Sequence, residues 1–199
     1  MIKVYGGRMG SSLRTHWMLA ELGVDYEQMP LNMREREHKK PEFLAINPTG
    51  QVPVLIDGET VLSESLAINE YLGLKFNPEM LGMTPAEKAE AWKWSLWAYV
   101  NIQHKLEEGV YQAIGMRPEN AELIAKEVEA VKPYLQILEN HLKGKKYLLG
   151  DKFSVSDINV GMTMSYAKYS KLEWTDFPNI AAWLKLITER PAYLKATAT

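Results

Sequence analysis

The spacing of apolar residues changes near residue 76, and this change constrains the fold more than any other feature of the chain. Before it, short apolar runs alternate with segments whose apolar residues recur at helical spacing. Beyond it, every segment with a clear pattern has helical spacing. A chain of 199 residues is long enough for one large domain or two small ones, so the change of pattern predicts two.

The first half predicts a small α/β unit with a mixed sheet. Its expected order is strand, helix, strand, a connection, strand, strand and helix, at residues 2–5, 11–22, 26–31, 52–57, 60–62 and 63–74. Gly23 is placed to end the first helix in the left-handed conformation. Asp57-Gly58 is a typical hairpin dipeptide and predicts a tight turn between the last two strands.

The second half predicts an all-helical domain. Thr84–Glu87 and Ser154–Asp157 have the spacing of capping boxes, in which two side chains satisfy the first N–H groups of a helix. Further helices are expected over 118–142, with a kink at Pro133, and over 178–189. The predicted domains are therefore residues 1–75 and 87–199, joined by a linker at 76–86.

Composition and charge exclude several classes of function. Lys and Arg number 23 against 25 Asp and Glu, whereas nucleic-acid-binding modules concentrate positive charge. No apolar run approaches the ~20 residues of a membrane helix, and the first residues lack the layout of a secretory signal. The chain has no cysteine, which rules out disulfides, thiolate metal sites and a cysteine nucleophile. We expect a cytoplasmic protein without nucleic-acid or membrane partners and without a metal.

Three motifs in a fixed order carry a resemblance to a known family. They are Asn47–Leu55 (NPTGQVPVL), Leu62–Ile68 (LSESLAI) and Phe153–Ile158 (FSVSDI). Together they resemble the cytosolic glutathione transferases over nearly the whole chain. The chain resembles Ser-type members of this family, and among the classes it is most similar to beta-, phi- and theta-like bacterial ones. The resemblance implies a thioredoxin-like N-terminal domain of order βαβ-α-ββα and an all-α C-terminal domain.

The same resemblance implies how glutathione is held. In the family the proline at the place of Pro53 is cis, which turns the backbone of Val52 outward to pair with an extended peptide. The alternative is a proline that only opens a strand. Glu64 and Ser65 would take the γ-glutamyl ammonium and carboxylate at a helix N-terminus, where free N–H groups attract anions. Ser63 or Ser65 is also expected to cap that helix.

Four further binding candidates come from the resemblance. His38 and Lys39 lie in the basic segment 37–43, which plant-type members use for the glycyl carboxylate, and Gln51 would assist. The alternative for this segment is a solvated charged loop. His104 belongs to a His-Lys pair that beta-class members place near the thiol, and the alternative is an inert histidine on a helix surface.

The residue that activates the thiol is left open among Ser11, Ser12 and Tyr5. The segment from Gly10 resembles the beta-class segment in which a cysteine stands at the place of Ser11. Mixed-disulfide chemistry is excluded here, but a serine hydroxyl can donate a hydrogen bond to a thiolate. One of the two serines is also expected to cap the first helix. Arg14, one turn on, is expected to be solvated, and the alternative is that it faces the dimer or the ligand.

The resulting prediction is an enzyme that conjugates glutathione, as co-substrate, to small hydrophobic electrophiles, a detoxification reaction. The resemblance also implies a homodimer. Two alternatives are kept: a weakly catalytic or non-catalytic binding or assembly module with this fold, and a zeta-like isomerase that uses glutathione. Trp92, Trp94 and Trp97 are expected in the core or an interface, and the alternative is that one or more line an apolar acceptor site. Asp157 is expected to serve folding.

Overall fold

The computed structural model describes residues 1–198, which divide into two compact units. The first unit comprises Met1–Pro78 together with the segment from Arg190 onward, and the second comprises Glu79–Glu189. The elements of the first unit are β1 (Ile2–Tyr5), α1 (Gly10–Leu22), β2 (Tyr26–Met29), η1 (Glu37–Lys39), α2 (Pro41–Leu44), β3 (Val54–Asp57), β4 (Thr60–Ser63), α3 (Ser65–Phe76) and α9 (Pro191–Thr197), the η elements being 3₁₀ helices.

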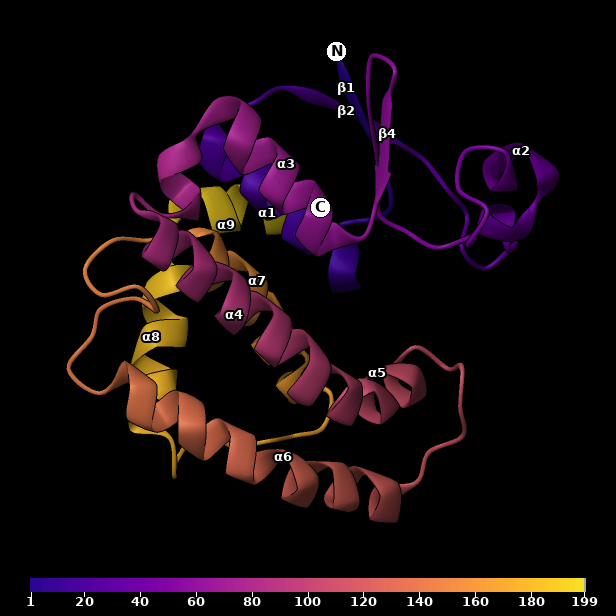
Figure 1. The fold of residues 1–199 in the computed structure, drawn as a ribbon. Helices are drawn as coiled ribbons and strands as arrows, with labels where there is room; N and C mark the ends of the chain where they lie inside the picture. Colours follow the sequence, from indigo (N-terminus) through magenta and orange to yellow (C-terminus); the bar gives the residue numbers. More distant parts are fainter. Residues whose placement is uncertain (199) are drawn as a thin grey trace. The chain divides into compact units, whose positions relative to one another are not determined.

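The sheet of the first unit is mixed and has the strand order β2-β1-β3-β4. β1 runs parallel to β2 and antiparallel to β3, and β3 and β4 form the predicted hairpin. In register, Val4 pairs with Leu55, and both are fully buried. α1 and α3 lie on one side of the sheet and α2 on the other (Figure 1). The predicted thioredoxin-like topology is thus confirmed.

Two elements of the first unit begin later than their apolar patterns predict. β3 begins at Val54 instead of residue 52, after a cis bond between Val52 and Pro53, and Pro53 has no N–H for a ladder. α3 begins at Ser65 instead of residue 63, because Glu64 has a positive φ of 68°. In both places the backbone leaves regular structure at residues that the sequence analysis assigned to the site.

The segment that follows Arg190 forms α9 and packs against α1 in the first unit. The rings of Trp17 and Tyr193 meet edge to face at 4.8 Å. The Arg190 guanidinium donates to both carboxylate oxygens of Glu21, at 2.7 Å each. The predicted helical domain of residues 87–199 therefore differs from the observed second unit at its C-terminal end, where α9 was not expected.

The second unit is helical. Its elements are α4 (Pro85–Asn101), η3 (Gln103–Lys105), α5 (Glu107–Ala113), α6 (Ala121–Leu142), α7 (Val155–Met164), η4 (Ser165–Lys168) and α8 (Pro178–Thr188), and η2 (Pro78–Leu81) spans the boundary between the units. Every residue of α7 is buried, so this helix forms the centre of the unit. Both capping boxes are present, at the starts of α4 and α7. No helix within residues 1–198 is both long and apolar enough to cross a bilayer.

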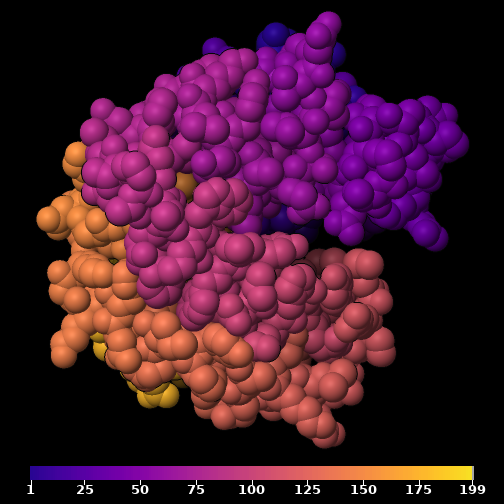
Figure 2. Space-filling view, viewed as in Figure 1, coloured from indigo at the N-terminus to yellow at the C-terminus, as the bar shows by residue number. Residues whose placement is uncertain are grey.

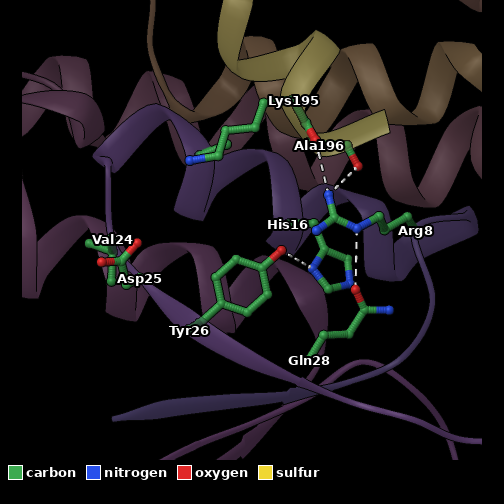
Figure 3. Close-up of a pocket in the computed structure, with 9 residues that line it drawn as sticks. Arg8, His16, Val24, Asp25, Tyr26, Gln28, Lys195 and Ala196 are labelled. Carbon is green, nitrogen blue, oxygen red and sulfur yellow. Dashed lines mark hydrogen bonds between the residues drawn. The ribbon is translucent and has the colours of Figure 1, made fainter. Parts of the chain in front are cut away.

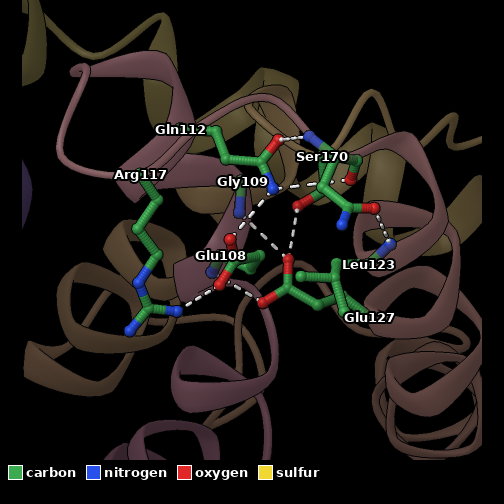
Figure 4. A network of polar contacts seen from close by, with 8 residues as sticks. Glu108, Gly109, Gln112, Arg117, Leu123, Glu127 and Ser170 are labelled. Carbon is green, nitrogen blue, oxygen red and sulfur yellow. Dashed lines mark hydrogen bonds and ion pairs between the residues drawn. The ribbon is translucent and has the colours of Figure 1, made fainter.

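Carboxylates of α6 and α7 hold the second unit together. Glu127 accepts from the N–H groups of Glu108 and Gly109 at the start of α5, at 2.7 and 3.1 Å (Figure 4). Glu139 accepts from the N–H of Ile180 in the first turn of α8 at 2.9 Å. Asp157 is fully buried in α7, as expected of a folding residue.

Candidate glutathione site

The loop between β1 and α1 separates the three candidates for thiol activation. Ser11 is half-buried, and its hydroxyl donates to the carbonyl oxygen of Val52 at 3.3 Å. Ser12 is only 2% exposed, and a Cβ built on Gly6 would lie 2.4 Å from its Oγ. Tyr5 packs its ring edge to face against Phe43 at 5.5 Å. Only Ser11 of the three thus has a hydroxyl hydrogen bond to Val52.

The expected serine cap on α1 is wrong. The N-cap residue is Met9, and no side chain caps the helix there. Because α1 begins at Gly10, Ser11 and Ser12 lie inside its first turn. The hydroxyl of Ser11 is therefore directed to Val52 instead of to the N–H groups of its own helix.

Val52 presents main-chain polar groups outside the regular ladder. The peptide bond to Pro53 is cis, as the resemblance implied. The Val52 carbonyl accepts from Ser11, and its N–H donates to no group within residues 1–198. An N–H outside the ladder, beside a C=O that has a second lone pair, matches what an added extended strand requires.

The N-terminus of α3 has no side-chain cap, which corrects the expectation for Ser63 or Ser65. The N-cap residue is Glu64, whose carbonyl accepts the N–H of Ile68 at 2.9 Å. The Glu64 side chain is exposed and forms no hydrogen bond or ion pair within the described chain. The first N–H groups of α3 therefore have no side-chain acceptor, and such groups favour an anion.

Arg14 is buried instead of solvated, which corrects a second expectation. It is 1% exposed on α1, and its Nη1 donates to the Oγ of Ser65 at 2.7 Å. The side chain of Asn69, one turn into α3, donates to the carbonyl of Arg14 at 3.3 Å. The helix that carries Ser11 is therefore fastened to the first turn of the helix that begins with Ser65.

The segment that contains η1 and α2 brings His38 and Lys39 to the loop that leads into Val52. The Lys39 ammonium donates to the carbonyl of Thr49 at 3.2 Å. Gly50 has a φ of 59°, and a Cβ there would lie 2.8 Å from the carbonyl of His38. This segment forms the violet lobe at the right of Figure 2. His38 and Lys39 therefore lie next to Gln51, whose exposed side chain forms no hydrogen bond within residues 1–198.

Burial of His38 favours its neutral form. Its Nδ1 is buried and has no hydrogen-bond partner within the described residues. Burial lowers the pKa of His38, and the charges of Lys39 and Arg36 lower it further. At neutral pH the basic character of this lobe thus comes from its lysines and arginines.

Comparisons with known proteins agree along the whole chain. The family model described as "Glutathione S-transferase, N-terminal domain" matches residues 1–73, and that of the C-terminal domain matches residues 98–191. Glutathione S-transferase 3 of Zea mays is 34% identical over 99% of this chain and 93% of its own length. The chain belongs to the glutathione transferase family.

Solved structures of glutathione transferases have the same fold. Glutathione S-transferase-I bound with lactoylglutathione is 31% identical with a TM-score of 0.88, each chain covered to 98%. Glutathione transferase F7 from Populus trichocarpa is 28% identical over 100% of both chains with a TM-score of 0.90. A theta class enzyme from Xanthomonas axonopodis pv. citri, solved with glutathione bound, is 28% identical over 100% of this chain and 97% of its own, with a TM-score of 0.89.

One feature of this glutathione transferase that the sequence did not indicate is a hydrogen-bonded chain from Tyr26 to Gly6. Buried His16 contacts the Tyr26 hydroxyl through Nδ1 at 2.8 Å (Figure 3) and the Gly6 carbonyl through Nε2 at 3.0 Å. A carbonyl only accepts, so Nε2 carries the proton and Nδ1 accepts from Tyr26. Burial lowers the pKa of His16, so the ring is neutral at neutral pH. His16 thus fixes the end of β1, from which the loop to Ser11 departs.

The hollow lined by His16 and Tyr26 contains none of the predicted site residues. It also includes Arg8, whose guanidinium donates to the carbonyls of Lys195 and Ala196 near the end of α9. These contacts tie α9 to the loop between β1 and α1. The residues that line the hollow therefore help to hold that loop in place.

His104 and the tryptophans belong to the second unit. α4 ends at Asn101, so the expectation that His104 continues this helix is wrong and it lies in η3. Its side chain is 51% exposed and contacts the Glu107 carboxylate at 3.1 Å. Trp94 is buried, whereas Trp92 is 40% exposed. Within residues 1–198 no cluster of three or more His, Asp or Glu side chains is arranged to hold a metal ion.

Proposed function

We propose that this chain binds glutathione in its first unit and conjugates its thiol to small hydrophobic electrophiles, with Ser11 stabilising the thiolate. The observation that carries the proposal is the hydrogen bond from the Ser11 hydroxyl to the Val52 carbonyl. It places a hydroxyl donor beside the backbone group best suited to hold the cysteinyl part of a peptide. The uncapped N-terminus of α3 supplies the anion-binding groups in the same unit.

Glutathione is an extended peptide with a carboxylate at each end, and the site offers matching groups. The N–H and C=O of Val52 pair with its cysteinyl backbone in the manner of an added strand. Ser65 and the first N–H groups of α3 receive the γ-glutamyl carboxylate, and Glu64 receives the ammonium. His38, Lys39 and Gln51 serve the glycyl carboxylate.

Stabilisation of the thiolate is the chemical task of Ser11. A free thiol with a pKa of about 8.5 is only ~3% ionised at pH 7. A hydroxyl that donates to an ionised sulfur contributes roughly 1.5–3 kcal/mol, which lowers the pKa of the thiol by about 1–2 pH units. The proton passes to solvent, and the sulfur lone pair then forms the bond to the electrophilic carbon. With an aryl halide the halide ion leaves with its bonding pair; with an isothiocyanate the carbon–nitrogen π pair moves to nitrogen, which takes up a proton from solvent.

A homodimer is part of the proposal. Trp92, Leu96 and Val100 are spaced by four residues and share one face of α4. They are 40%, 52% and 54% exposed in the isolated chain, which is unusual for large apolar side chains along a single stripe. We place the reaction in the cytoplasm, where the glutathione pool is kept reduced.

The first test of this proposal is retention on immobilised glutathione and elution by free glutathione. Ser65→Ala should weaken retention, whereas Ser165→Ala, the same change in the second unit, should not. Turnover is then measured with four acceptors: conjugation of an aryl halide and of an isothiocyanate, reduction of an organic peroxide, and thiol exchange with a disulfide. Failure to bind millimolar glutathione would overturn the proposal. Binding without turnover of any acceptor would favour the binding-module alternative.

A further inference from the structure

The contact between Arg14 and Ser65 joins a buried cation to a residue of the glutathione site. Arg14 comes from α1 and Ser65 is the first residue of α3, 51 positions later. The bond between Nη1 and Oγ is 2.7 Å long and buried. Ser65 is 6% exposed and stands at the N-terminus of α3, which has no side-chain cap.

The chemistry of this bond determines the direction of the Ser65 hydroxyl. A guanidinium has donors only, so the serine oxygen is the acceptor. The hydroxyl hydrogen therefore points away from Arg14, and no group within residues 1–198 accepts it. A carboxylate has acceptors only, so this hydrogen has the polarity that a carboxylate needs. An oxygen that already accepts from a cation is also a better donor, because hydrogen bonds in a chain polarise one another.

We infer that Arg14 is a positioning residue for glutathione, which fixes the Ser65 hydroxyl as a donor to the γ-glutamyl carboxylate. This inference rests on the proposed function. Ser11 and Arg14 are three residues apart and lie on the same side of α1. One helix thus positions both the donor to the thiolate and, through Ser65, the donor to the carboxylate.

The test compares glutathione with 4-aminobutyryl-cysteinyl-glycine, which lacks only the γ-glutamyl carboxylate. Dissociation constants of the full-length protein are measured for both peptides by calorimetry. Arg14→Met and Ser65→Ala should each weaken glutathione binding roughly tenfold, the effect of one charge-assisted hydrogen bond, and change binding of the analogue less than about twofold. Once Ser65→Ala is present, adding Arg14→Met should cause little further loss for either peptide.

A purely structural role would change the two dissociation constants together. Arg190→Met is the matched control, because it removes another guanidinium from the same unit, and it should leave their ratio unchanged. If Arg14→Met does not fold, Arg14→Lys replaces it, and the preference for glutathione over the analogue should still fall by more than about threefold. An unchanged ratio in the folded Arg14 variant overturns the inference. If the wild-type protein binds neither peptide, the proposed function fails and the inference fails with it.

Discussion

Ser11 and Ser12 are neighbours in the chain, but the fold gives their hydroxyl groups different surroundings. Ser11 is half-buried with its hydrogen directed to Val52, whereas Ser12 is 2% exposed and packs against Gly6. The greater exposure of Ser11 is what favours it over Ser12 in the proposed activation of the thiol, whereas the burial of Ser12 favours a packing role.

Asp157 predicts a pH dependence of stability. Burial raises the pKa of this carboxyl from 3.8 to about 6, against hydrogen bonds from Leu148, Trp183 and Ser154. Between pH 3.8 and about pH 6, Asp157 holds a proton in the folded state that it has lost in the unfolded state. The free energy of unfolding therefore falls as pH rises from about 4 to about 6. Over this range the free energy of unfolding falls by about 3 kcal/mol, at 1.36 kcal/mol per unit of pKa difference.

Urea unfolding of the wild type and of Asp157→Asn checks this effect. The stability of the wild type relative to the variant should decrease as pH rises from about 4 to about 6 and then stay constant. The variant is needed because other carboxylates titrate in the same range. A stability difference that rises with pH would show that hydrogen bonding outweighs burial at this site.

The sequence supplied candidate residues for the site, but not the contacts that these residues make. Ser11, Val52 and Ser65 were identified from motifs. The spacing that places Arg14 in a helix gave no sign that its guanidinium is buried, because its partner lies 51 residues away. His16 was missed for the same reason, since its acceptor and its donor are reached only when β1 and β2 pair in the sheet.

At the scale of elements, long periodic segments were predicted and short ones were not. α1, α3, α4, α6 and α8 follow from apolar spacing and caps, with ends that moved by a few residues. α2, α5 and α9 have only four to seven residues, which is too short for a helical period to be visible. Pro191 lies two residues beyond the predicted helix over 178–189, and it is the first residue of α9.

α9 should contribute to stability through its pairing with α1. Glu21 is 7% exposed in its side chain and accepts both from Arg190 and from the indole N–H of Trp17. Arg190→Ala leaves this carboxylate buried with one partner fewer. Because Arg190 is 29% exposed, we expect a loss on the order of 2 kcal/mol instead of the full value for a buried pair.

Denaturant unfolding measures this loss, with Lys185→Ala as the control. Lys185 pairs with Glu189 at 3.9 Å, but both side chains are more than 60% exposed, at 75% and 66%. Such a pair contributes roughly 0–1 kcal/mol, so the control should be close to wild type. Equal effects of the two substitutions would contradict a structural role for the α9 contact.

At the scale of the whole molecule, the exposed stripe on α4 predicts self-association. A dimer should elute at twice 22.7 kDa, or about 45 kDa. Leu96→Glu introduces a charge at the middle of the stripe and should shift the protein to the monomer, because a buried unpaired charge costs several kcal/mol. Light scattering after size exclusion gives both masses. Val61→Glu, a comparable change on β4 of the first unit, should leave the mass unchanged.

The pKa of the thiol in bound glutathione tests the assignment of Ser11 most directly. Thiolate absorbance of the protein–glutathione complex is followed against pH for the wild type, Ser11→Ala, Ser12→Ala and Tyr5→Phe. Ser11→Ala should raise the pKa of the thiol by about 1–2 pH units, with little change in glutathione affinity, and the other two variants should titrate like the wild type. A Ser11→Ala complex that titrates like the wild type, while Ser12→Ala or Tyr5→Phe shifts, would contradict the account.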